Sequence, residues 1–258
     1  MKCLLVADLH YALKQFDWLQ SVSADFDLVV LAGDLLEISS AVEKRTQIVV
    51  VRTYLEELAR TTRVVVCSGN HDLDTHDARG ELVAGWVQDL NELGIVTDWG
   101  RVMVGTTLIT VCPWWDGPAT RDAIGQQLAA DAAIAKDRWI WVYHAPPSDS
   151  PVSWGGKRHF GDADLSAWIG THQPDLVLSG HVHQSPFIDG GSWADRIGRT
   201  WVFNSGQQIG ATPAHVALNL ESGEAVWFSL AGAEIVSMGD TPERPYASLS
   251  AVPDWLKA

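Results

Sequence analysis

Short runs of large apolar residues recur along the chain, and five of them are each followed by a loop that carries Asp, Asn or His. Apolar runs without polar interruption are typical of strands buried on both faces of a sheet. The predicted strands of this kind cover residues 2–7, 28–33, 64–67, 139–143 and 175–179. Helical segments separate most of them, which indicates right-handed βαβ connections. The pattern therefore predicts an α/β fold.

Apolar residues three or four positions apart predict the helices between these strands. The longest helix is expected to open with a capping box at Ser40 and Glu43, while Thr120 and Asp162 are expected to cap two others. The predicted helices lie near residues 13–19, from 40–43 to about 59, and over 81–93, 120–136 and 162–169.

The remaining segments predict hairpins and loops. Hairpins are expected over 101–112 and around 221–224, with a further strand at 200–203. Residues 73–80 are polar and residues 145–161 are rich in Pro, Gly and Ser, so both are predicted as loops. A loop as long as the second is usually functional or disordered, and its place after a predicted ligand suggests a rim over the site.

Length and charge limit the possible functions. The 258 residues suit one large α/β domain, which we expect over residues 1–238, followed by a tail at 239–258 that packs on the surface or frays. The formal net charge is −14, from 18 Lys and Arg against 32 Asp and Glu. A nucleic-acid-binding protein needs a basic surface, so nucleic acid is disfavoured as a partner. A bound metal is not counted in this charge, so a local positive site remains compatible with it.

The cysteines and the apolar runs indicate a cytoplasmic protein without a membrane segment. Cys3, Cys67 and Cys112 each lie in an apolar run and form no Cys-x-x-Cys motif, which is typical of buried reduced thiols. The first apolar run stops at Asp8, too early for a signal peptide. None approaches the ~20 residues of a membrane helix.

The polar residues at the strand exits have the chemistry of metal ligands. They are Asp8, His10, Asp34, Asn70, His144, His181 and His183. Carboxylate and imidazole together suit Mn, Fe, Zn, Co or Ni. Seven ligands exceed the needs of one ion, so they favour two divalent transition-metal ions with one bridging carboxylate. Two ions ~3.5–4 Å apart are the usual apparatus for displacement at phosphorus.

The motifs resemble those of the calcineurin-like metallophosphoesterases. Asp8-x-His10, Gly33-Asp34, Gly69-Asn70-His71-Asp72, His144 and Gly180-His181-x-His183 occur in the order that defines this family. The resemblance covers residues 1 to about 205. It implies two packed mixed β-sheets flanked by helices, a four-layer αββα sandwich. It also implies that the first ion binds Asp8, His10, Asp34 and His183, and that the second binds Asp34, Asn70, His144 and His181.

The resemblance assigns His71 to catalysis. The family uses this histidine as a cation near the transferred phosphoryl group or as a general acid to the leaving oxygen. Asp72 has two interpretations: it orients the His71 ring and keeps it protonated, or it caps the loop.

Departures from the family pattern favour one branch. Protein phosphatases of the superfamily extend the second motif to Gly-Asp-x-x-Asp-Arg-Gly, and residues 33–39 lack that Arg. Residues 143–147, Tyr-His-Ala-Pro-Pro, look like the smaller phosphodiesterase-type branch. We therefore expect a metal-dependent phosphodiesterase, with manganese a suitable metal, that acts on small or nucleotide-like phosphoesters. Phosphomonoesterase or protein phosphatase, DNA nuclease and non-catalytic metal-binding scaffold are the alternatives, and the oligomeric state stays open.

Several loop residues are candidates for substrate contacts. They are Lys157, Arg158, His159 and His76. The alternative for these side chains is a solvated surface role. Trp114 and Trp115 have a similar pair of interpretations, base stacking or packing, and packing is favoured.

Overall fold

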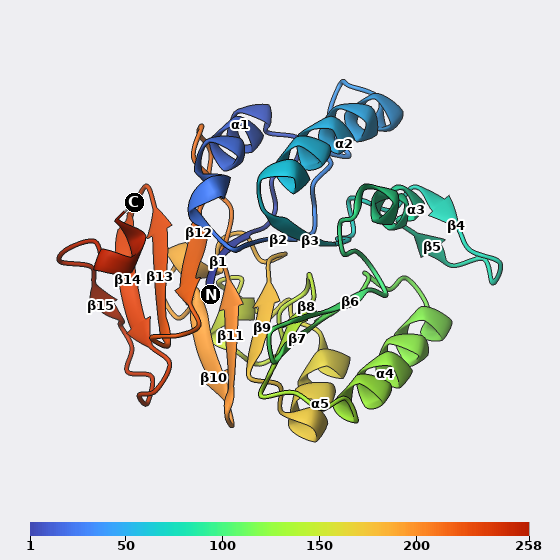
Figure 1. Ribbon diagram of the computed structural model, residues 1–258. Helices are drawn as coiled ribbons and strands as arrows, with labels where there is room; N and C mark the ends of the chain where they lie inside the picture. The colour runs from blue at the N-terminus through green and yellow to red at the C-terminus, as the bar shows by residue number, and fades with distance from the viewer. Residues whose placement is uncertain (258) are drawn as a thin grey trace.

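Two β-sheets packed face to face form the centre of the computed structural model, which describes residues 1–257 (Figure 1). Helices α1 (Leu13–Val22) and α2 (Lys44–Thr61) cover the outer face of one sheet. Helices α4 (Pro118–Ala132) and α5 (Ala163–His172) cover the outer face of the other. The fold is therefore the four-layer αββα sandwich that the family resemblance implies.

The sheet beneath α1 and α2 has seven strands. They are β1 (Lys2–Val6), β2 (Leu28–Ala32), β3 (Arg63–Cys67), β12 (His215–Asn219), β13 (Glu224–Ser229), β14 (Gly232–Ser237) and β15 (Ala247–Ser248). Their order is β15-β14-β13-β12-β1-β2-β3. The pairs β1–β2 and β2–β3 are parallel, and the others are antiparallel.

The second sheet has six strands. They are β6 (Arg101–Val104), β7 (Thr107–Val111), β8 (Arg138–Val142), β9 (Leu176–Ser179), β10 (Ala194–Ile197) and β11 (Thr200–Asn204). Their order is β10-β11-β9-β8-β7-β6, and the four central strands run parallel. Short 3₁₀ segments elsewhere cover Ser23–Asp25, Asp89–Leu93, Pro151–Ser153, Ser185–Phe187 and Asp254–Leu256.

The apolar runs are continuous because these strands are buried on both faces. Along β1, Leu5 points into the core between the sheets, while Leu4 and Val6 pack beneath the helices. Along β2, Val30 likewise points into the core between the sheets, while Val29 packs beneath the helices. Successive strand side chains face opposite sides, so a strand in the middle of four layers needs apolar residues at every position.

Three helix predictions are wrong in a cap, in a boundary or in the type of element. Helix α2 begins at Lys44 with no side-chain cap, because Ser40 Oγ accepts the nearby N–H of Val42 instead. The expected helix over 81–93 divides into strand β5 (Leu82–Val83), helix α3 (Gly85–Gln88) and a 3₁₀ turn, because β5 pairs with β4 (Thr75–His76).

The Glu81 carboxylate caps a neighbouring helix instead of starting its own. It accepts the N–H groups of Ala119 and Thr120 at 2.8 and 2.7 Å, so it caps α4 from outside the helix and Thr120 does not. Helix α4 ends at Ala132 rather than near Lys136, whose Nζ bonds the last carbonyls, including that of Asp131 at 2.8 Å. Asp162 caps α5 as predicted, since it accepts the N–H of Asp164.

The chain beyond β13 adds strands that the sequence analysis did not predict. Strand β14 follows β13 as a hairpin, and β15 pairs with β14. Tyr246 lies in the core between the sheets and donates its hydroxyl to the Ala194 carbonyl at 3.0 Å. The domain boundary at residue 238 stays a prediction. In the described residues no helix combines the length and apolar character that a membrane crossing requires.

Candidate metal centre

The predicted ligands all stand at strand exits that meet at one end of the two sheets. Asp8 and His10 follow β1, Asp34 follows β2, and Asn70 follows β3. The second sheet contributes His144 after β8 and both His181 and His183 after β9. Strands β1, β2 and β3 are parallel, as are β8 and β9. In each sheet the predicted ligands therefore lie together at the carboxyl ends of these strands.

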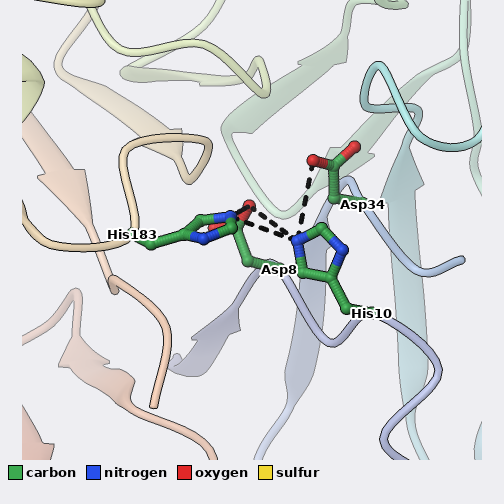
Figure 2. Close-up of side chains that lie close together, drawn as sticks. All are labelled: Asp8, His10, Asp34 and His183. Atoms are coloured by element: carbon green, nitrogen blue, oxygen red, sulfur yellow. Dashed lines mark hydrogen bonds and ion pairs between the residues drawn. The ribbon is translucent and has the colours of Figure 1, made fainter. Parts of the chain in front are cut away.

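One group of four side chains points at a common centre (Figure 2). His183 Nε2 lies 3.3 Å from Asp8 Oδ1 and 3.1 Å from His10 Nε2. His10 Nε2 lies 3.8 Å from Asp34 Oδ2 and 4.0 Å from Asp8 Oδ1. One ligand atom from each residue lies within 4.8 Å of all the others. Two carboxylates and two imidazoles at this spacing can hold a transition-metal ion.

A second group shares Asp34 with the first. Asp34, His144 and His181 also place their ligand atoms within 4.8 Å of one another, and His144 Nε2 is 3.3 Å from Asp34 Oδ2. The His144 Nδ1 lies 2.6 Å from the Ala32 carbonyl, so it is the donor nitrogen and Nε2 faces the cluster. The Asn70 Oδ1 atom is buried without a hydrogen-bond partner, as is His144 Nε2. Such buried polar atoms fit a bound cation.

Four of the predicted ligands have a strained backbone. Asp8, His10, Asp34 and His181 have φ values of 56, 43, 54 and 69°. This left-handed region is uncommon for residues with a Cβ, and strain of this kind clusters at functional sites. The strand exits therefore hold these residues in conformations that the rest of the fold must stabilise.

Two motif glycines are required by close approach of the ligands. Gly33 has φ of 85°, and a Cβ there would lie 2.5 Å from Nδ1 of His144. A Cβ on Gly69 would lie 2.2 Å from Oδ1 of Asp34. These glycines therefore give the Asp34 carboxylate and the buried His144 imidazole the room they occupy.

Electrostatics at the centre favour a cation. Burial would lower the pKa of His144, but Asp34 and Asp8 outweigh it and raise that pKa to about 9. Burial would raise the pKa of Asp34, yet His144 holds it far below its usual range. Burial and the nearby His144 lower the pKa of His181 to about 4. A proton on His144 thus balances the carboxylates that a divalent ion would balance, so the residues present fit such an ion.

Asp72 fixes the ligand loops rather than the His71 ring. Its carboxylate is fully buried and accepts the N–H groups of Asp34, Leu35, Leu36 and Gly69 at 2.8–3.1 Å. These bonds tie the loop after β2 to the loop after β3. Of the two interpretations, the structure therefore favours loop capping, because both oxygens are used by backbone donors. Burial, followed by the charge of Asp34, raises the pKa of Asp72 to about 7.

His71 lies beside the first group of predicted ligands, and its ring faces Glu37. Its N–H donates to Asp34 Oδ1 at 2.8 Å, and its ring centroid is 4.5 Å from that of His10. Its Nδ1 lies 3.9 Å from Oε1 of Glu37. Glu37 also lies 3.5 Å from Nδ1 of His10, through Oε2. Glu37 was not among the residues predicted from the sequence, because it lies beyond the residues at the strand exit.

The four candidate substrate-contact residues are not brought to the cluster. The Arg158 guanidinium lies over the Phe160 ring at 4.5 Å, and His159 Nδ1 lies 3.0 Å from Ser153 Oγ. Lys157 is exposed, and His76 is exposed in the β4–β5 hairpin. The loop over residues 145–161 is held together by internal hydrogen bonds, such as that from the Phe160 N–H to the Ser153 carbonyl. In the described part of the chain, none of the four has a hydrogen bond or ion pair with a predicted ligand.

Two pockets border the cluster instead. The His10-side pocket, about 520 Å³, is lined by residues that include His10, Leu13, Lys14, Glu37, Gln208 and Ile209. The His181-side pocket, about 460 Å³, is lined by residues that include Trp114, Trp115, Asp116, Phe160, Asp164 and His181. Trp114 lies in this second lining beside two predicted ligands, since its ring centroid is 5.2 Å from that of His181 and 5.7 Å from that of His144. The packing interpretation of Trp114 agrees with these contacts, and the ring also faces open space.

Comparison with solved structures identifies the fold. A Thermus thermophilus protein, TT1561, is 16% identical, with a TM-score of 0.54 over 92% of this chain and 98% of that one. A dimetal phosphatase from Danio rerio is 10% identical, with a TM-score of 0.52 over 88% and 95% of the two chains. The purple acid phosphatase PPD1 from yellow lupin is 14% identical, with a TM-score of 0.57 over 100% of this chain and 55% of that one.

Comparison with family models identifies the family. No curated protein sequence matched the chain. The model of the calcineurin-like phosphoesterases matches residues 1–185, which contain all seven predicted ligands. The chain therefore belongs to the calcineurin-like phosphoesterase family, as its motifs predicted, and is a metal-dependent hydrolase of phosphoester bonds.

Proposed function

We propose that the protein is a phosphodiesterase that acts on small or nucleotide-like esters at a centre of two divalent transition-metal ions. The position of Asp34 supports the proposal of a second ion, because its carboxylate belongs to both ligand groups. Asp8, His10, Asp34 and His183 would hold one ion, and Asp34, Asn70, His144 and His181 the other. Such ions, when bound, polarise phosphoryl oxygens and lower the pKa of a water molecule.

The chain's own residues complete the reaction. His71 would donate a proton to the leaving oxygen, because its ring stands beside His10 but it is the only one of the pair outside the predicted ligand set. Glu37 would orient that ring, since its Oε1 lies 3.9 Å from Nδ1 of His71. Burial opposes ionisation of Glu37, but hydrogen bonds from Ser39 and the nearby His10 and His71 outweigh it and lower the pKa.

Two observations support a diester rather than a monoester substrate. A phosphodiester carries two substituents, and two pockets border the cluster at different histidines. A diester also brings one negative charge, whereas a monoester dianion brings nearly two. Residues 33–39 lack the motif arginine with which the protein phosphatases hold phosphate. The net charge of −14 disfavours a long polyanion such as DNA.

A phosphomonoesterase is the second candidate, and Lys14 favours it. This lysine lines the His10-side pocket and brings the one cationic side chain among the described residues of that lining. An ammonium group there would offset the extra charge of a monoester dianion.

One comparison separates the two candidates. The protein is stripped with a chelator and loaded with manganese, and kcat/KM is measured for bis(4-nitrophenyl) phosphate and 4-nitrophenyl phosphate. We expect the diester to be preferred. A preference above about tenfold for the monoester, ~1.4 kcal/mol in transition-state binding, would assign the protein to the phosphomonoesterases. The native metal, a small-molecule substrate as the only partner and a cytoplasmic location stay predictions from the sequence.

A further inference from the structure

The His181-side pocket combines aromatic walls with carboxylates. Its lining contains the rings of Trp114, Trp115 and Phe160 and the side chains of Asp116, Asp162 and Asp164. Its volume of about 460 Å³ lies within the usual range for small-molecule sites. None of the described residues that line it is Lys or Arg. The pocket therefore presents π faces and negative charge without an internal counter-ion.

Some side chains of this lining already form hydrogen bonds within the protein. Trp115 Nε1 donates to Asp162 Oδ2 at 2.9 Å, and the Asp162 Oδ1 atom caps α5. These bonds fix the Trp115 ring as a rigid wall. Asp116 accepts only a long bond, 3.4 Å, from the Leu82 N–H, and in the described chain the Asp164 carboxylate has neither a hydrogen bond nor an ion pair. Two carboxylates are thus available to a ligand.

Two arginines lie near this lining. Arg121 forms a 2.8 Å ion pair with Asp122, and the hydrogen bond and charge of Asp122, with smaller effects of Asp164 and Asp162, raise the pKa of Arg121. Arg158 places its guanidinium 4.5 Å from the centre of the Phe160 ring. Arg158 thus occupies a face of Phe160, so the aromatic faces that remain for a ligand cation are those of Trp114 and Trp115, which have no cationic partner among the described residues.

We propose that the His181-side pocket binds a positively charged alkylammonium substituent of the substrate, such as the ester of an ammonium alcohol. This inference rests on the proposed phosphodiesterase function, because it names one of the two ester substituents. The ring of Trp114 lies 5.2 Å from that of His181, so a group against this ring adjoins the place of the phosphoryl group. Aromatic faces attract cations electrostatically, and Asp116 and Asp164 add a charge that favours an ammonium group and disfavours an anion.

The test uses two diesters that differ in one atom. In 4-nitrophenyl phosphocholine the substituent ends in a trimethylammonium group, and in 4-nitrophenyl 3,3-dimethylbutyl phosphate a neutral carbon replaces the nitrogen. With the metal-loaded enzyme we expect kcat/KM to be about tenfold higher for the ammonium ester. In the variant with Asp116→Asn and Asp164→Asn the ratio should fall towards one. A wild-type ratio below about two, or an unchanged ratio in this variant, would overturn the inference.

A matched control and a second readout keep the two proposals separable. The variant with Asp25→Asn and Glu221→Gln removes two exposed carboxylates outside this pocket, so its ratio should equal that of the wild type. Binding is measured separately by saturation-transfer NMR with choline and 3,3-dimethylbutanol. If no diester is hydrolysed, the proposed function fails. The inference about the His181-side pocket is then tested by NMR alone. A choline signal that exceeds the 3,3-dimethylbutanol signal and disappears in the Asp116/Asp164 variant supports binding of an ammonium group there. Equal NMR signals, or hydrolysis of both diesters at equal rates, would contradict it.

Discussion

The Oε1 atom of Glu37 lies 3.9 Å from Nδ1 of His71. The same carboxylate reaches His10 Nδ1 at 3.5 Å through its other oxygen. One acidic side chain thus faces both a predicted metal ligand and the predicted proton donor. Its side chain is 28% exposed, so it can respond to a substrate that enters the His10-side pocket.

Replacement of Glu37 should impair proton donation. We expect Glu37→Gln to lower kcat on diesters with poor leaving groups by about tenfold or more, while 4-nitrophenyl esters lose less, because general acid help matters most when the leaving oxygen needs a proton. Rates are compared across leaving groups that differ in basicity. A loss that is equal for all leaving groups would contradict this role.

Removal of the imidazole itself separates donor from ligand. His71→Gln should lower turnover of poor leaving groups by roughly 10²–10⁴-fold with little loss of metal. His10→Ala is the matched comparison, because the two rings are neighbours and only His10 is a predicted ligand. Metal content after dialysis distinguishes them. If His71→Gln loses metal in proportion to activity, His71 is a ligand.

Much of the centre could be predicted because each ligand lies within four residues of the end of a buried strand. An apolar run that ends in Asp34 or His144 places that residue at a sheet edge, and parallel strands bring such edges together. Glu37 and the role of Asp72 could not be found in this way. Glu37 lies beyond the strand exit, and Asp72 bonds backbone groups of Leu35 and Leu36, which are distant in sequence.

The expected helix over 81–93 also failed because of contacts between segments that are distant in sequence. Leu82, Trp86 and Leu90 have helical spacing, but strand pairing with His76 holds Leu82 in β5. The local pattern was compatible with a helix, and contacts between distant segments decided otherwise. Two-sheet packing likewise came from the family resemblance, because the alternation of strands and helices alone does not distinguish one sheet from two.

Metal stoichiometry should report the shared carboxylate. We expect the wild type to bind about two ions per chain and Asn70→Ala about one, because Asn70 belongs only to the second predicted set. Asp34→Ala should weaken both sites, since its carboxylate belongs to both ligand groups. Elemental analysis after equilibrium dialysis measures the ratio. Retention of one full ion in Asp34→Ala would assign that carboxylate to a single site.

Metal affinity should rise with pH. In the metal-free protein the pKa of His144 is raised to about 9, so its imidazolium contributes stability that is present below pH 6.5 and lost as pH rises through about 9. A metal ion needs the neutral Nε2 and must displace that proton. Binding near pH 7.5 should therefore release close to one proton from this residue. Calorimetry in buffers of different ionisation enthalpy measures the release, and a value that does not depend on pH between 7 and 10 would contradict it.

A buried carboxylate, that of Asp98, lies behind the ligand loops. Asp98 Oδ1 accepts the Ser68 N–H at 2.8 Å, next to the loop that carries Asn70, while Oδ2 is buried without a partner. Burial raises the pKa of Asp98 from 3.8 to about 7, against the opposing hydrogen bonds from Ser68. A raised pKa means that the neutral acid stabilises the fold below about pH 4 and that this contribution is lost as pH rises through about 7.

Asp98→Asn should therefore stabilise the metal-free protein at alkaline pH. Asparagine keeps the oxygen that accepts from Ser68 and has no charge to bury. The gain at pH 8 has an upper limit of about 4 kcal/mol, since each pKa unit corresponds to about 1.4 kcal/mol, and it should vanish near pH 4. Denaturant unfolding of both proteins at pH 4 and pH 8 measures the difference, with the exposed Asp25→Asn as a control that should be nearly flat. An equal loss of stability at both pH values would mean that Asp98 is needed as a charged acceptor, and that its burial is offset by groups other than Ser68.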